Sequence, residues 1–196
     1  MKRKGGFVLD INETAAWVKR LQTGDDSAFD AIFAAYQKQA VRTAALITGE
    51  VSLAEDVAQE AFVNCLLHIK DLKEPNRFKP WFFRTLTRCA WKAMEEKTPT
   101  VDWGEALEKV MPSAPDTYPS EKEAVYERLY QALDGLGKKQ RTTIILYYFN
   151  DLSIREIAEA TSSLEGTVKT RLFAAKRRLK RVLEADGQKG AEIYEI

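Results

Sequence analysis

The sequence is poor in the residues that build redox, metal and catalytic sites. Its 196 residues include two cysteines and one histidine, and no C-x-x-C motif or Cys/His cluster is present. Cys65 and Cys89 each lie within an apolar helical pattern, so we expect reduced, buried thiols. His68 has no serine or cysteine partner arrangement, and Asp56 and Glu60 share a helix face without a second acidic cluster. We therefore expect no metal, no cofactor and no enzymatic activity.

Long apolar runs and strand patterns are also scarce. No stretch approaches the length of a membrane-spanning helix, and the basic N-terminus, MKRKGGFVLDIN, lacks the apolar run of a signal peptide. We therefore expect a cytoplasmic protein. The apolar content of 45% and the charged content of 30% are globular values. Together with helical periodicity along most of the chain, they predict an all-α fold.

Proline is concentrated in one segment, Thr98–Ser120, which also carries an acidic excess. Four of the six prolines lie there: Pro99, Pro112, Pro115 and Pro119. This composition predicts a flexible linker over 98–120, with one short helix around 103–110. The flanking segments then form two helical domains, 12–97 and 121–185, and a tail without pattern follows at 186–196.

The strongest local pattern lies between Leu152 and Leu183. Ser153 and Glu156 form an S-x-x-E capping box, which predicts a short helix starting at Ser153. Ser162 and Ser163 interrupt that helix, and Ser163 is a candidate N-cap for a second one. The second helix carries an apolar stripe at steps of four and three: Val168, Leu172, Ala175, Leu179 and Leu183. A short helix, a tight turn and a longer helix are typical of a helix-turn-helix DNA-binding unit.

The second helix of this pair is strongly basic. Between Thr167 and Leu183 it has seven cations and no carboxylate, whereas an ordinary solvated helix mixes both signs. At about 100° per residue, Thr170, Phe173 and Arg177 point away from the apolar stripe. These features favour DNA binding over a merely solvated surface. The candidate contact residues are Thr167, Lys169, Thr170, Arg171, Phe173, Lys176, Arg177 and Arg178.

The N-terminal part of the sequence predicts four helices. The first runs over Thr14–Thr23, the third over Ser52–Ile69 and the fourth over Phe78–Lys97. The second is a long helix with caps and first-turn acids at 25–27; it continues to Thr48 and is ended by Gly49. In the third, Ser52 with Glu55 gives the opening signal. Apolar positions assigned to the core include Phe33 and Leu66. Arg84, Arg88 and Lys92 recur at intervals of four in the fourth helix, and by spacing alone this ridge favours solvated surface over a DNA contact.

Four segments, taken together, resemble a known family. In order they are GDDSAFDAIFAAYQKQAVRTAALITG, LAEDVAQEAFVNCLLHI, FKPWFFRTLTRCAWKA and LSIREIAEATSSLEGTVKTRLFAAKRRL. They resemble regions two and four of the extracytoplasmic-function sigma factors, small members of the sigma-70 superfamily, over about Ala16 to Leu183. The resemblance implies a sigma region 2 bundle and a sigma region 4 helix-turn-helix. Such a protein binds core RNA polymerase and directs it to promoter DNA.

The resemblance also implies roles for individual residues. Docking on the coiled coil of the polymerase's largest subunit carries over to Asp56, Gln59 and Glu60. Opening of the minus-ten element carries over to the segment Lys70–Lys92, where Asn76 is the candidate reader of an extruded base and Arg84, Arg88 and Lys92 are candidates to hold the backbone. Ordinary turn chemistry after Pro75 explains Asn76 equally well. In the second helix of the helix-turn-helix, the resemblance places Lys169, Thr170 and Phe173 against bases of the minus-thirty-five element, with Arg177 close by, and Arg171, Lys176 and Arg178 on phosphates.

The sequence departs from the family pattern at a few positions. Serines stand at 162 and 163, where a glycine and an apolar residue are usual, so the geometry of the turn is open. Ala174 and Gly137 replace a common arginine and a frequent proline. An anti-sigma factor is common in the family, and the sequence leaves open whether one binds. The alternative function is a helix-turn-helix activator whose N-terminal domain senses a ligand or dimerises, and which binds duplex DNA unaided.

Overall fold

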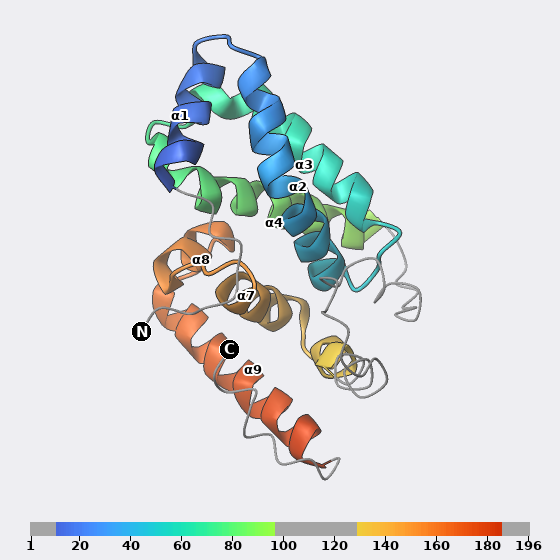
Figure 1. Cartoon of the computed structure of the whole chain (residues 1–196). Helices are drawn as coiled ribbons and strands as arrows, with labels where there is room; N and C mark the ends of the chain where they lie inside the picture. The colour runs from blue at the N-terminus through green and yellow to red at the C-terminus, as the bar shows by residue number, and fades with distance from the viewer. Residues whose placement is uncertain (1–10, 97–128, 186–196) are drawn as a thin grey trace, which may run out of the picture.

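The computed structural model describes residues 11–96 and 129–185, and gives side-chain placement as far as residue 182. The predicted linker, residues 121–128 of the second predicted domain, and the predicted tail lie outside the described residues. Every regular element within the described residues is helical, which confirms the all-α prediction. The helices form an N-terminal body (residues 11–96) and a C-terminal body (residues 129–185), labelled in Figure 1.

The N-terminal body is a bundle with an aromatic core. Its elements are α1 (Ile11–Gln22), α2 (Ser27–Thr48), α3 (Ala54–His68), the 3₁₀ turns η1 (Ile69–Asp71) and η2 (Pro75–Arg77), and α4 (Phe78–Glu96). Helices α2, α3 and α4 all pack on one another. Tyr36 of α2 meets Phe78 of α4 edge to face at 5.2 Å between ring centroids, and Phe62 of α3 lies 4.8 Å from Phe82. These rings are buried, and they fix the relative positions of the three helices.

Local sequence signals predicted the end of α2 correctly, but they did not predict the start of α3. Gly49 follows α2 with φ 80°, and its N–H donates to the carbonyl oxygen of Ala45, as expected of a left-handed C-terminal glycine. The prediction that Ser52 caps α3 was wrong. Its Oγ donates to the Glu50 carboxylate at 2.6 Å, and the helix begins two residues later, at Ala54.

Two apolar residues assigned to the core are exposed. Phe33 is 37% exposed and Leu66 is 44% exposed. Phe33 covers Phe62, with 4.8 Å between ring centroids, at the rim of the contact between α2 and α3. On α3 the buried face continues from Phe62 to Cys65, which turns Leu66 outward. The predicted stripe on this helix was therefore wrong at Leu66, whereas its last residue, Ile69, is buried as expected.

The C-terminal body supports a helix-turn-helix. After a helical segment at 129–134 come α7 (Lys138–Tyr148), α8 (Ile154–Ala160) and α9 (Glu165–Ala185). Residues 141–146 of α7 are all buried, and α7 packs against both α8 and α9. The strongly apolar run Gln140–Asn150 (QRTTIILYYFN) predicts a buried helix packing under the helix-turn-helix, and the structure confirms it. Helix α9 extends away from the rest of the molecule (Figure 1).

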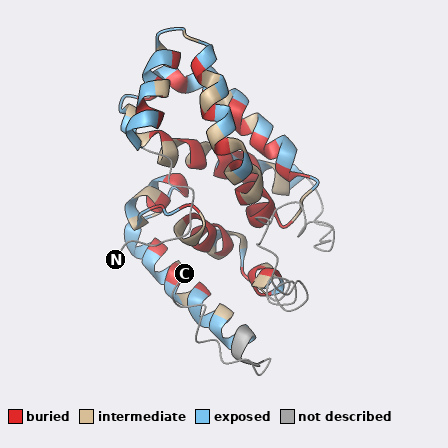
Figure 2. Cartoon of the chain, viewed as in Figure 1, coloured by how far each residue is buried: buried red, intermediate tan, exposed pale blue. Residues whose placement is uncertain are grey.

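The two bodies pack directly on each other. Helix α7 lies against α2, and α8 lies against α4. Buried apolar residues from both bodies form one continuous cluster, and Figure 2 shows buried residues on both sides of the contact, whereas the outer face of α9 is exposed. No pattern in the sequence predicted this packing.

Candidate nucleic-acid and polymerase interfaces

The first helix of the helix-turn-helix is fixed by its capping box. The backbone N–H of Glu156 donates to Ser153 Oγ at 3.3 Å, and the backbone N–H of Ser153 donates to the Glu156 carboxylate at 2.8 Å. The S-x-x-E prediction is therefore confirmed, with Ser153 as the N-cap and Ile154 as the first helical residue. Two backbone donors are satisfied in this way at the start of a seven-residue helix.

The turn between α8 and α9 takes a conformation that glycine usually adopts. Ser162 has φ 48°, in the left-handed region that L-residues other than glycine enter at a cost. The prediction that Ser163 caps α9 was wrong, because α9 begins at Glu165. The Ser163 hydroxyl donates to the carbonyl oxygen of Thr161 at 3.1 Å and accepts a hydrogen bond from Arg171 at 2.8 Å.

Helix α9 has the two faces that its periodicity predicted. Val168, Leu172 and Ala175 are buried. On the opposite side, Thr170 and Arg177 are exposed, and the Phe173 ring is 68% exposed. A large aromatic ring this open to solvent on a cationic helix is available to touch another molecule.

Several cations of α9 have supports that hold them in place. Arg171 is half-buried and bonded to Ser163. The Lys176 ammonium lies 5.3 Å from the ring centroid of Tyr148, a cation–π distance. Arg178 lies over the turn at Gly135, where an added Cβ would come within 3.4 Å of its guanidinium. Supported cations lose less side-chain freedom when they meet a phosphate. Thr167 and Lys169 are exposed near the start of the helix.

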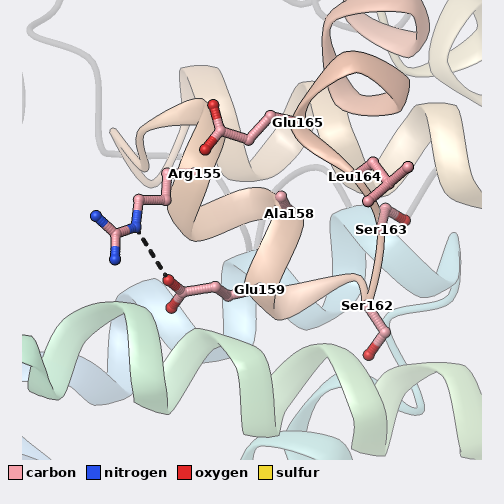
Figure 3. A pocket seen from close by; sticks show the side chains of 7 residues that line it. All are labelled: Arg155, Ala158, Glu159, Ser162, Ser163, Leu164 and Glu165. Carbon is pink, nitrogen blue, oxygen red and sulfur yellow. Dashed lines mark ion pairs between the residues drawn. The ribbon is translucent and has the colours of Figure 1, made fainter.

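A hollow of about 540 Å³ lies beside the turn (Figure 3). It is lined by Arg155, Ala158, Glu159, Ser162, Ser163, Leu164 and Glu165. On its α8 side, Arg155 and Glu159 form an i,i+4 ion pair at 3.4 Å, and Leu164 is 78% exposed. None of these side chains forms a nucleophile–base pair.

The predicted polymerase-docking residues share the outer side of α3. Asp56 and Gln59 are exposed, and Glu60 is half-buried. The same side continues into two apolar residues that the sequence analysis missed, Val63 and Leu67, which are 57% and 70% exposed. Their spacing of four from Gln59 and from each other was the signal that could have identified them. An apolar patch beside acidic groups fits a protein partner better than it fits DNA.

The predicted minus-ten residues differ in their surroundings. Asn76 is exposed in η2, and Arg88 and Lys92 are exposed on α4. Arg84 is half-buried, and its Nε is enclosed without a hydrogen-bond partner among the described residues. Lys92 donates to the Glu60 carboxylate at 3.1 Å, so this ridge adjoins the predicted docking face.

The described residues contain neither a metal-ligand cluster nor a membrane-spanning helix. No group of three or more His, Cys, Asp and Glu side chains there could hold a metal ion. No helix in the same ranges is long and apolar enough to cross a membrane.

Comparison with known proteins identifies both bodies. The family model of Sigma-70 region 2 matches residues 32–98, and that of Sigma-70, region 4 matches residues 126–179. The chain is similar to the ECF RNA polymerase sigma factor SigW of Bacillus subtilis, with 30% identity over 85% of this chain and 94% of SigW. It is also similar to the RNA polymerase sigma factor SigV of the same organism, with 34% identity over 62% of this chain and 70% of SigV.

Solved structures support the same fold. CnrH, solved with the cytosolic domain of CnrY, gives a TM-score of 0.68 at 19% identity over 89% of this chain and 99% of CnrH. The sigma factor RpoE, solved with the anti-sigma factor NepR from Bartonella quintana, gives a TM-score of 0.57 at 19% identity. The match covers 89% of this chain and 96% of RpoE. The region 2 match accounts for the N-terminal body, which the activator alternative assigned to sensing or dimerisation. The chain belongs to the extracytoplasmic-function family of RNA polymerase sigma factors, and as an alternative sigma factor it directs transcription initiation.

Proposed function

We propose that three surfaces of this sigma factor have separate roles. Helix α9 reads the minus-thirty-five element, the η2–α4 segment opens and holds the minus-ten element, and α3 docks on core polymerase. The observation that carries this proposal is the outward row of α9. Lys169, Thr170 and Phe173 are exposed opposite a buried stripe, on the second helix of a capped helix-turn-helix, within the region 4 match.

On α9 the chemistry suits base edges and phosphates in different places. The Lys169 ammonium can donate to the O6 and N7 acceptors of guanine, and the Phe173 ring can contact a thymine methyl group. Arg171, Lys176 and Arg178 flank these two positions and fit phosphates, because their supports hold them in place. Thr167, Thr170 and Arg177 complete the contact surface. Phosphate contacts position the helix, and base contacts select the sequence.

On the N-terminal body the chemistry suits a separated strand. The Asn76 amide offers both a donor and an acceptor to the edge of an extruded base. Arg88 and Lys92 are exposed cations on the helix that follows, and Arg84 adds a third, half-buried cation. Extruding a base costs a few kcal/mol of stacking, which contacts of this kind must offset.

Docking on core polymerase combines charge with apolar contact. Asp56, Gln59 and Glu60 form the polar part of the α3 surface, and Val63 and Leu67 form its apolar part. An apolar centre with a polar rim is the usual composition of a protein–protein interface. The coiled coil of the polymerase's largest subunit is the proposed partner.

The proposal has three further parts. The chain is not an enzyme, because none of its three surfaces needs bond-making chemistry. It acts in the cytoplasm, where RNA polymerase and promoter DNA lie. An anti-sigma factor holds it inactive, as CnrH and RpoE, which share its fold, were solved with CnrY and NepR.

Multi-round transcription in vitro tests the proposal. Bacterial core polymerase transcribes a fragmented genomic template with and without the protein. We expect new discrete start sites only when the protein is present, each preceded by two shared sequence elements. Unchanged start sites, together with unaided binding of the protein to duplex DNA, would contradict the proposal.

A further inference from the structure

One side chain of the first helix reaches the segment that carries Asn76. The side-chain amide of Gln22, the last residue of α1, donates to the carbonyl oxygen of Ile69 at 2.9 Å and to that of Leu72 at 2.8 Å. These acceptors belong to η1 and to the residue directly after it. Helix α1 also packs against both η1 and η2. The proposed base reader therefore lies on a segment that α1 holds.

The two hydrogen bonds need the NH2 group of an amide. That group has two donors and no acceptor, and here it donates to two different backbone carbonyl oxygens. Gln22 is half-buried, and a hydrogen bond is electrostatically stronger inside a protein than in water. A carboxylate at position 22 would only accept hydrogen bonds, so it would repel both carbonyl oxygens. The site therefore distinguishes glutamine from glutamate, although the two side chains have nearly the same shape.

The end of α1 is itself fixed by the turn that leads into α2. The backbone N–H of Asp25 donates to the carbonyl oxygen of Arg20 at 3.0 Å, and Gly24 has φ 95°, as expected of a glycine that ends a helix. The Arg20 guanidinium pairs with the Asp25 carboxylate at 2.7 Å. That carboxylate also accepts a hydrogen bond from the Ser27 hydroxyl at 2.6 Å. The Gln22 side chain thus starts from a well-supported backbone.

The segment that Gln22 holds is anchored at both ends and carries Asn76 between them. The side chains of Leu72 and Phe78 are buried, whereas Asn76 is exposed. The backbone is extended at Glu74, with φ −116° and ψ 98°. The N–H of Arg77 then donates to the carbonyl oxygen of Glu74 at 2.8 Å. A shift of the backbone at Leu72 therefore moves Asn76 relative to α4.

Contact with a base depends on where the Asn76 amide lies, and not only on its presence. Hydrogen bonds weaken steeply when their distances and angles depart from the preferred values, and a recognition group must be held to within about 0.5 Å. A loop that already has its bound conformation also loses less conformational entropy on binding. The two bonds of Gln22 supply restraint of this kind at Ile69 and Leu72.

We propose that Gln22 is a positioning residue for the minus-ten contact, and that its two hydrogen bonds hold the loop 69–77 so that Asn76 meets the extruded base. This inference deepens the proposed role of the η2–α4 segment and rests on it. Gln22 acts through the loop backbone and does not touch DNA. It also lies outside the residues that the region 2 family model matches, 32–98. Selectivity at the minus-ten element thus depends on a residue of α1.

Base preference at the minus-ten element tests the proposal. A promoter found by multi-round transcription is prepared with each of the four bases at each position of that element. Open complexes of the holoenzyme on these versions are then compared in competition. Gln22→Met keeps the length of the side chain but removes both donors, so we expect the preference at the position that Asn76 reads to fall by about fivefold or more. Gln22→Glu should lower it at least as far.

The matched control for these variants is Gln39→Met. Gln39 is also half-buried, and its amide donates to a backbone carbonyl oxygen, that of Phe149 at 3.2 Å, away from the loop. We expect this control to keep the wild-type base preference. Affinity for core polymerase and selectivity at the minus-thirty-five element should be unchanged in Gln22→Met. If Gln22→Met lowered the Tm but left the minus-ten preference unchanged, Gln22 would be a structural support only, and the proposal would be overturned.

The variant Asn76→Ala shows whether the effect passes through the base reader. In that background, Gln22→Met should cause no further loss of preference, because Gln22 acts through Asn76. An equal further loss in both backgrounds would contradict this route. If Asn76→Ala alone kept the wild-type preference, the proposed function of Asn76 would fail instead. The two failures are therefore distinguishable.

Hydrogen exchange gives a readout that needs neither promoter nor polymerase. The backbone amides of Leu72 and Arg77 donate to the carbonyl oxygens of Ile69 and Glu74, at 3.2 and 2.8 Å. We expect both amides to exchange about tenfold faster in Gln22→Met than in the wild type, while the amides of α2 keep their rates. Unchanged exchange at both amides would show that the loop does not depend on Gln22. That result would overturn the proposal whether or not Asn76 reads a base.

Discussion

The carboxylate of Glu60 and the ammonium of Lys92 lie 3.1 Å apart. This ion pair joins α3, the proposed polymerase-docking helix, to α4, the proposed minus-ten helix. The hydrogen bond to Glu60 raises the pKa of Lys92 above its ordinary value, so Lys92 is fully charged at neutral pH. A partner protein that bonds to the Glu60 carboxylate would therefore break this ion pair and leave the Lys92 ammonium available to a DNA phosphate.

Substitutions at this pair separate docking from DNA contact. We expect Glu60→Gln to weaken binding to core polymerase several-fold, because it removes a charge from the docking face. Lys92→Gln should leave that affinity nearly unchanged and lower the yield of open promoter complexes. Biolayer interferometry and permanganate footprinting measure the two effects. Glu13→Gln on α1 is the control for a charge change away from both surfaces. Equal loss of polymerase affinity in both variants of the pair would contradict the division of roles.

The recognition helix should show two kinds of effect. Lys169→Ala and Phe173→Ala should each relax selectivity at particular positions of the minus-thirty-five element, by about 1–3 kcal/mol for a good base contact. Arg178→Ala should weaken all sequences about equally and reduce the salt slope by about one phosphate contact. Competition assays over single-base variants of the promoter, at several salt concentrations, distinguish the two. If all three substitutions lowered the affinity equally for every promoter variant, the result would argue against base reading by α9.

Local signals in the sequence predicted the elements that depend on nearest neighbours. The Ser153–Glu156 box and Gly49 are satisfied within a few residues, and both were read correctly. Ser52 and Ser163 carried the same kind of signal and failed, because each hydroxyl bonds another group, the Glu50 carboxylate and the Thr161 carbonyl respectively. Capping is a competition among partners, and spacing alone does not decide it.

The contact between the bodies could not be predicted in the same way. It depends on Arg141 and Asn150, residue types that a sequence pattern assigns to the surface. Their partners are the carbonyl oxygen of Leu46 and the hydroxyl of Thr43, about a hundred residues away along the chain. Only the three-dimensional packing makes the burial of these polar groups favourable. The outward residues of α9 were predictable because a regular helix places them by geometry alone.

The turn of the helix-turn-helix offers a test of strain. Ser162 has φ 48°, so Ser162→Gly should relieve the cost of the left-handed conformation. We expect stabilisation by about 0.5–1 kcal/mol and a Tm higher by about 2 °C. Ser163→Gly is the matched neighbour with the opposite expectation, since it removes the acceptor of Arg171. Calorimetry on both variants measures the direction of each change in Tm. A Tm for Ser162→Gly below that of the wild type would show that the backbone at Ser162 is not strained.

The buried thiols give the chain a dependence on alkaline pH. Burial raises the pKa of Cys65 from 9.0 to about 12 and that of Cys89 from 9.0 to about 11. Because the folded-state values lie above the unfolded ones, the thiols' contribution to stability is fully present below pH 9. It is lost as the pH rises from there through the folded-state pKa values of about 11 for Cys89 and about 12 for Cys65. Native thiols should accordingly resist alkylation at pH 8, where little thiolate is present.

Urea titrations at pH 8 and pH 10.5 measure this loss, with Cys65→Ala/Cys89→Ala as the comparison. Tyr36, whose pKa burial also raises, titrates with the same sign in both proteins, so it cancels in the difference. The double variant should begin less stable, because it leaves space in the core, but its unfolding free energy should fall less between the two pH values. Parallel decreases in the two proteins would mean that the thiols ionise in the folded chain as readily as in the unfolded one, and would contradict the raised pKa values.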